Sequence, residues 1–143
     1  MPSELRSRSS AKRSATTSPG ASLRIGWFTA IRLVLELGED LTRFTSGKKI
    51  ASFVGLTCSE DSTGETEHKG RITGMGPGFI RATLIENSWA AIRKDPVLLG
   101  KFERVWHASG NRKKAIVAVA RMLIVRLRTC LISGTPYMIG VAA

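Results

Sequence analysis

Two adjacent hydroxyl side chains, Ser62 and Thr63, stand directly before Gly64 near the middle of the chain. A hydroxyl group beside a turn that glycine permits can act as a nucleophile, provided that a base or nearby cations activate it. Ser-Thr-Gly is a short sequence, and an ordinary solvated loop also explains it. We therefore treat Ser62 and Thr63 as candidate catalytic residues, with a plain loop as the alternative.

A glycine-rich run, GMGPG, occupies residues 74–78 and leads into a helical pattern. Glycines let backbone N–H groups approach a phosphate, and the partial positive charge of a helix N-terminus favours an anion there. Arg71 and Arg81 flank the run. The pattern fits a phosphate contact, and the alternative is a plain turn that starts a helix.

The chain is strongly basic, because 22 Lys and Arg residues against 11 Asp and Glu residues give a formal net charge of +11. Such an excess favours polyanionic partners, most commonly nucleic acid. Lys114, Arg121 and Arg128 recur every seven residues and would share one side of a helix, which could follow a phosphate backbone or be a solvated face. The candidate nucleic-acid-binding residues are Lys48, Lys49, Arg71, Arg81, Lys113, Lys114, Arg121 and Arg128.

Motifs for metals and cofactors are absent from the sequence, including HExxH, the EF-hand loop and the GxxxxGK[ST] phosphate loop. His68 and His107 are isolated, so we assign no metal ligands. The two cysteines, Cys58 and Cys130, are far apart, which argues against a zinc site and a disulfide scaffold and fits a reducing cytosol. No apolar run approaches the roughly 20 residues of a membrane span. We expect a cytoplasmic protein.

The chain divides into a tail and one domain. Residues 1–20 are rich in Ser, Thr and Arg and have few large apolar residues, so we expect a disordered basic tail. Residues 21–143 should form a mainly α domain of four or five helices, with a long Gly-rich central loop and at most a minor β element. Helices are predicted at about 22–37, 79–94, 96–109 and 111–132, with a short helix or strand at 48–54 and a loop at 57–78 that holds at most a short strand at 71–73.

Apolar spacing predicts which faces of the helices are buried. Ala82, Ile85, Trp89 and Ile92 repeat at helical intervals and should form one buried stripe. In the last helix the buried stripe should consist of Ile116, Ala120, Leu123 and Leu127.

Read in order, several segments are similar to a known family. They are ELGEDLTRFTSGKKIASFVGL, SEDSTGE, GRIT, IRATLIENSWAAIRKDP, KKAIVAVARMLIVRL and GTPY. Over residues 23–137 the chain resembles the C-terminal domain of the insertion-sequence 110/116/902 transposases, which are DEDD-type, serine-nucleophile recombinases. The resemblance implies that a hydroxyl in this domain attacks a DNA phosphate and forms a covalent intermediate. It also implies a separate N-terminal RNase-H-like domain in which four acidic residues hold Mg²⁺, so no cofactor is expected in this chain.

The chain departs from the family pattern at several positions. The low-complexity tail at 1–20 comes directly before the C-terminal domain, where the family has its RNase-H-like domain. We therefore expect that domain to be absent and the transposase to be truncated. Thr63 stands at the family's usual serine position, and Ser62 is one residue upstream. Gly74 and Pro77 replace the family's Lys and Asn.

The resemblance implies DNA as the partner, a guide RNA from the element, and an oligomer with full-length transposase, with no membrane partner. We expect the chain to be nucleoid-associated and inactive in transposition by itself. One alternative is a nucleic-acid-binding remnant without catalytic activity. Another is the poorly folded product of a pseudogene.

Overall fold

The computed structural model describes residues 32–33, 35–38, 40–63, 66–72 and 74–140, and between 58 and 72 it describes the backbone alone. The predicted tail at 1–20 and most of the predicted helix at 22–37 lie outside these residues. The described end of that helix is helical up to Leu37, and Gly38 follows with a φ of 77°, as expected of the residue that ends a helix.

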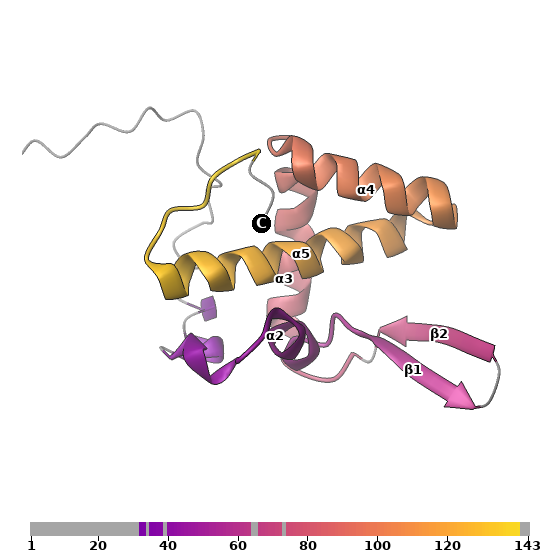
Figure 1. Ribbon diagram of the computed structural model, residues 1–143, viewed down its shortest axis with the longest axis horizontal. Coiled ribbons are helices and arrows are strands. Elements are labelled where there is room, and N and C mark those ends of the chain that lie inside the picture. The colour runs from indigo at the N-terminus through magenta and orange to yellow at the C-terminus, as the bar shows by residue number, and fades with distance from the viewer. Residues whose placement is uncertain (1–31, 34, 39, 64–65, 73, 141–143) are drawn as a thin grey trace, which may run out of the picture.

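The described residues form a mainly helical structure, which confirms the predicted fold class (Figure 1). The elements are η1 (Leu41–Arg43), α2 (Gly47–Phe53), β1 (Cys58–Thr63), β2 (Thr66–Ile72), α3 (Gly78–Ala91), α4 (Pro96–Ser109) and α5 (Arg112–Ser133). The segment at 48–54, which was predicted to be a short helix or a strand, forms helix α2. None of the described helices combines the length and the apolar character that crossing a membrane requires.

Helix α5 is the centre of the fold, because η1, α2, α3 and α4 all pack against it. In Figure 1, α4 lies along one side of α5, and α2 and the two strands lie on the opposite side. Asn111 begins α5 by accepting hydrogen bonds from two backbone N–H groups, and Gly134, at φ 66°, ends it. The predicted stripe is buried at Ile116, Ala120 and Leu123, and its fourth member, Leu127, is half-buried against the core.

The buried stripe of α3 differs from the prediction. Ala82 is exposed, while Ile80, Leu84 and Ser88 are buried, so the helix is rotated by about one residue position from the predicted face. The Ser88 hydroxyl donates to the Leu84 carbonyl at 2.6 Å, which satisfies a polar group inside the core. Of the predicted stripe, Ile92 is buried and Ile85 and Trp89 are half-buried against the core, so the prediction was right in part.

The predicted central loop contains a β-hairpin. Strands β1 and β2 pair antiparallel, with Glu60 opposite Lys69 and Thr63 opposite Thr66, and the ladder is irregular between Cys58 and Glu60. Figure 1 shows the hairpin extending away from the helices. The strands are almost entirely polar, so they lack the alternation of apolar residues by which a sequence predicts a half-buried strand. The expectation of only a short strand at 71–73 was therefore wrong for most of this segment.

A buried carboxylate joins three parts of the fold. Asp95 is fully buried, caps α4 through the Val97 N–H, and forms an ion pair of 2.9 Å with Arg126 of α5. The Tyr137 hydroxyl donates to the same carboxylate at 2.6 Å, and the Gly140 N–H donates at 3.2 Å. Asp95 therefore holds α4, α5 and the C-terminal segment together.

The surroundings of Asp95 change the pKa values of two groups. Burial opposes ionisation of the Asp95 carboxyl, but the hydrogen bonds from Tyr137, Val97 and Gly140, together with the charge of Arg126, outweigh it and lower its pKa. Burial, followed by the hydrogen bond to Asp95, raises the pKa of Tyr137 to about 12.

The lowered pKa of Asp95 predicts acid sensitivity. The ordinary pKa of the group is 3.8. Since the folded protein binds this proton less tightly than the unfolded chain does, the stabilisation is complete above about pH 4 and is lost as the pH falls through the folded-state pKa. We expect the free energy of unfolding to fall more steeply between about pH 5 and pH 2 in the wild type than in Asp95→Asn. Urea titrations across that range measure the free energy of unfolding of both proteins against pH. Parallel curves would contradict the lowered pKa of Asp95.

Candidate functional site

The two candidate nucleophiles lie on β1, at the end of the strand beside the hairpin turn. Ser62 pairs with Glu67 of β2, and Thr63 forms the last pair of the ladder with Thr66. The structure thus places both hydroxyl-bearing residues at the tip of a hairpin that extends from the helical body (Figure 1). Their catalytic role stays a prediction.

The base of the hairpin is held by two glycines, each of which lies close to the backbone of another segment. Gly55 and Gly76 have φ angles of 74° and 107°, in the region that other residues rarely adopt. A Cβ atom on Gly55 would collide with the Met75 carbonyl, and a Cβ atom on Gly76 would collide with the Phe53 carbonyl. The segment that follows β2 is therefore packed backbone to backbone on the end of α2.

Arg81 strengthens the same junction. Its Nη1 atom donates to the Gly74 carbonyl at 3.0 Å and to the Val54 carbonyl at 3.4 Å, so one guanidinium links α2 to the segment after β2. The glycine-rich run at 74–78 is thus part of the packing at the hairpin base. A phosphate contact by Arg81 stays a prediction, and the other nitrogen atoms of its guanidinium carry N–H groups that could still serve it.

The other candidate cations are spread over several elements. Lys48 and Lys49 are exposed in the first turn of α2, and Lys113 and Lys114 are exposed in the first turn of α5. Arg71 lies on β2. Each of these two helical turns carries two of the candidate lysines, and Arg71 lies on a separate element.

The predicted stripe on α5 is uneven. Lys114 and Arg121 are exposed, whereas Arg128 is partly buried and its Nε donates to the Phe44 carbonyl at 2.8 Å. Arg128 therefore fastens the end of η1 to α5, which a seven-residue period cannot reveal. Its contact with nucleic acid stays a prediction.

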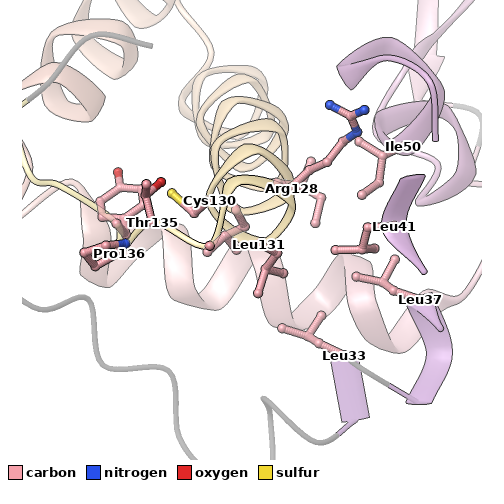
Figure 2. A pocket seen from close by; sticks show the side chains of 13 residues that line it. Leu33, Leu37, Leu41, Ile50, Arg128, Cys130, Leu131, Thr135 and Pro136 are labelled. Atoms are coloured by element: carbon pink, nitrogen blue, oxygen red, sulfur yellow. The ribbon is translucent and has the colours of Figure 1, made fainter. Parts of the chain in front are cut away.

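An apolar pocket of about 590 Å³ lies between the 33–41 segment and the C-terminal end of α5. Figure 2 shows Leu33, Leu37, Leu41 and Leu131 around it, with Arg128 as the charged residue among those labelled. Such a lining suits an apolar group and offers little to a phosphate. In the described part of the chain, moreover, no three His, Cys, Asp or Glu side chains come together as a metal site.

Comparison with known proteins identifies the chain's class. A family model described as the transposase IS116/IS110/IS902 family matches residues 8–103. The match covers more than half of the chain, so this protein belongs to that transposase family. No curated protein and no solved structure matches the chain.

The matched region contains the whole hairpin and the junction at its base. It begins at residue 8, inside the segment interpreted as a tail, and it ends within α4, so α5 lies beyond it. Sequence reasoning named Arg81 and the 74–78 run as a phosphate contact, but it missed that Gly55 and Gly76 hold the hairpin base in place. Their signal was the pair of glycines on either side of a polar segment, which a turn also explains.

Proposed function

We propose that this chain takes part in DNA transposition by supplying the hydroxyl nucleophile that attacks a DNA phosphate. In this step the hydroxyl oxygen of Thr63 or Ser62 bonds to phosphorus, and the bond from that phosphorus to a deoxyribose oxygen breaks. The hydroxyl proton ends on the released deoxyribose oxygen, so atoms and charge are conserved. The observation that carries the proposal is the family match, which spans the hairpin that bears both residues.

The position of the hairpin supports this role. The tip extends from the helices, while the base is held by backbone packing and by Arg81 (Figure 1). A reactive group on a projecting element can reach the backbone of a DNA duplex, and the packing at the base positions it. Thr63 occupies the family's nucleophile position, and Ser62 is the second candidate.

We propose that the Mg²⁺ of the reaction is held outside the described side chains, among which no three His, Cys, Asp or Glu come together. We propose that the acidic ligands come from an RNase-H-like domain of the family and that the active complex is an oligomer with full-length transposase. We also propose that an RNA from the element guides target choice and that the complex works on the nucleoid in the cytoplasm.

The covalent step is tested with a helper. The purified chain is mixed with junction DNA and with a full-length family transposase whose own nucleophile has been replaced by alanine. We expect an SDS-resistant protein–DNA complex that contains this chain, and its loss in the Ser62→Ala/Thr63→Ala double variant. Each single variant identifies which hydroxyl reacts.

Thr66→Ala is the matched control, because it removes a hydroxyl directly opposite Thr63 across the hairpin. It should form as much covalent complex as the wild type. If the double variant also forms the complex in full, the catalytic proposal fails.

DNA affinity should depend strongly on salt. Each phosphate that is neutralised on duplex DNA contributes about −0.9 to the slope of log K against log salt. Replacing the exposed pair Lys48 and Lys49 by alanine should therefore make the slope less negative by about 2. Fluorescence anisotropy of a labelled duplex, titrated at salt concentrations from about 50 to about 300 mM NaCl, measures the slope. An unchanged slope would remove these two lysines from the DNA interface.

A nucleic-acid-binding protein without catalytic activity is the second candidate function. The threonine at the nucleophile position favours it, because a β-branched hydroxyl is harder to align for attack. This alternative predicts salt-dependent DNA binding with no covalent complex in any assay that includes the helper.

A further inference from the structure

Aromatic rings and a guanidinium form a continuous cluster where α4, α5 and α3 meet. The Arg112 guanidinium lies 5.7 Å from the centre of the Trp89 ring and 5.4 Å from that of Trp106. Phe102 lies between the two indoles, with ring centres 5.7 Å from Trp89 and 5.9 Å from Trp106. His107 stacks on Trp106 at 5.5 Å, with 24° between the ring planes. We call Trp106, His107 and Arg112 the aromatic corner.

The cluster is buried at one end and open at the other. Phe102 is buried and Trp89 is half-buried against the core. Trp106 keeps 37% of its surface exposed, and His107 and Arg112 are exposed. The inner rings thus support an outer set of flat π surfaces at the turn between α4 and α5.

The charges beside the aromatic corner favour an anion. Arg112, Lys113 and Lys114 are the first three residues of α5, and this first turn contains no acid. Cations at a helix N-terminus are disfavoured by the helix dipole, so this arrangement lowers the stability of the free protein. Natural proteins break such local rules at functional or strained sites. A bound phosphate would reverse the unfavourable interaction, since the same helix end attracts anions.

We propose that the aromatic corner binds unpaired DNA bases by stacking, while Lys113 and Lys114 hold the adjacent phosphates. Flat rings next to cations are the pattern by which proteins bind single strands without reading their sequence. The choice of DNA over RNA rests on the proposed function, because strand exchange exposes unpaired DNA. The stacking itself rests only on the aromatic corner and the cations of α5.

A purely structural role for the cluster makes a different prediction. If Arg112 only tied α4 to α5, the bases of a ligand would not matter. Lysine would keep the charge of Arg112 but lose the flat guanidinium that lies near both indoles. Comparing the DNA affinity of Arg112→Lys with that of the wild type therefore separates stacking from simple charge attraction.

The experiment measures binding by fluorescence anisotropy of three labelled strands: oligo-dT, an abasic strand with the same phosphates, and oligo-rU. Each strand is about 15 nucleotides long, which is within the site sizes of single-strand binders. Trp106→Ala should weaken oligo-dT binding about tenfold, within the range expected for loss of one base stack. Binding of the abasic strand should be unchanged. Arg112→Lys should weaken oligo-dT binding in the same direction and leave abasic binding intact.

Leu131→Ala is the control, because Leu131 is an exposed apolar residue (62%) near the other end of α5. It should bind every strand as the wild type does. Circular dichroism melts check that each variant folds. If Trp106→Ala does not fold, Arg112→Lys serves as the main test.

Equal losses for oligo-dT and the abasic strand, or no loss, would overturn the stacking proposal. A loss confined to oligo-rU would overturn the assignment to DNA. The assay involves no covalent step, so failure of the hairpin chemistry and failure of the aromatic corner are distinguished.

Discussion

Replacing Asp95 by alanine should lower the free energy of unfolding by about 3–5 kcal/mol, the range found when one partner of a buried ion pair is removed. The substitution leaves the Arg126 guanidinium buried without its carboxylate. It also removes the cap of α4 and the acceptor for Tyr137 and Gly140. These losses act on one site, so they are not additive.

Two variants place the Asp95 result on a scale, using urea denaturation for all three. Asp40→Ala removes a carboxylate that caps η1 through the Thr42 N–H but is exposed, so its effect should be small. Tyr137→Phe removes one hydroxyl and should cost about 1 kcal/mol. If Asp95→Ala is no more destabilising than Asp40→Ala, the buried network does not hold the fold together.

Gly76→Ala should be the most damaging change at the hairpin base. A non-glycine residue at a φ of 107° is strained, and the new Cβ atom would collide with the Phe53 carbonyl. Backbone strain costs about 1–3 kcal/mol and overpacking costs about as much again, so we expect a loss of about 2–6 kcal/mol. The end of α2 and the segment after β2 would have to separate, and the hairpin would lose its support.

Gly100→Ala is the matched control for Gly76→Ala. Gly100 lies inside α4, and no atom lies within 4 Å of the point that an alanine Cβ would occupy, so alanine adds no collision. There it should stabilise the protein by about 1 kcal/mol, because alanine is the better helix former. Thermal or urea unfolding of both variants should give opposite signs. A mild effect of Gly76→Ala would contradict the close backbone packing.

The helix boundaries could be predicted from the sequence because single residues determine them. Pro96 is accepted at the start of α4 but not further along a helix, and Asp95 is a strong cap. Gly110 and Gly134 end α4 and α5 in the left-handed conformation that glycine favours. These signals are local, so they are visible without knowing the fold.

The hairpin and part of the buried face of α3 could not be predicted because their determinants are non-local or polar. The strands are paired by backbone hydrogen bonds and have no apolar alternation to reveal them. Ser88 can be buried only because its hydroxyl bonds to Leu84 in its own helix. Sequence periodicity assigns such residues to the surface.

The arginines of α5 show the same limit. The sequence places Arg121, Arg126 and Arg128 in one helix, but only the packed structure gives each a different environment. Arg121 is exposed, Arg126 is buried against Asp95, and Arg128 donates to the Phe44 carbonyl. Charge alone cannot tell a cation that holds the fold from one that is available to DNA.

The most direct test of the central claim is to locate the covalent bond. The complex formed with junction DNA and the nucleophile-deficient helper is digested with protease and nuclease, and the peptides are sequenced by mass spectrometry. We predict a nucleotide attached to Thr63 or Ser62 in the peptide from the hairpin. A nucleotide attached to any other residue, or a complex containing the helper alone, would contradict the proposed function.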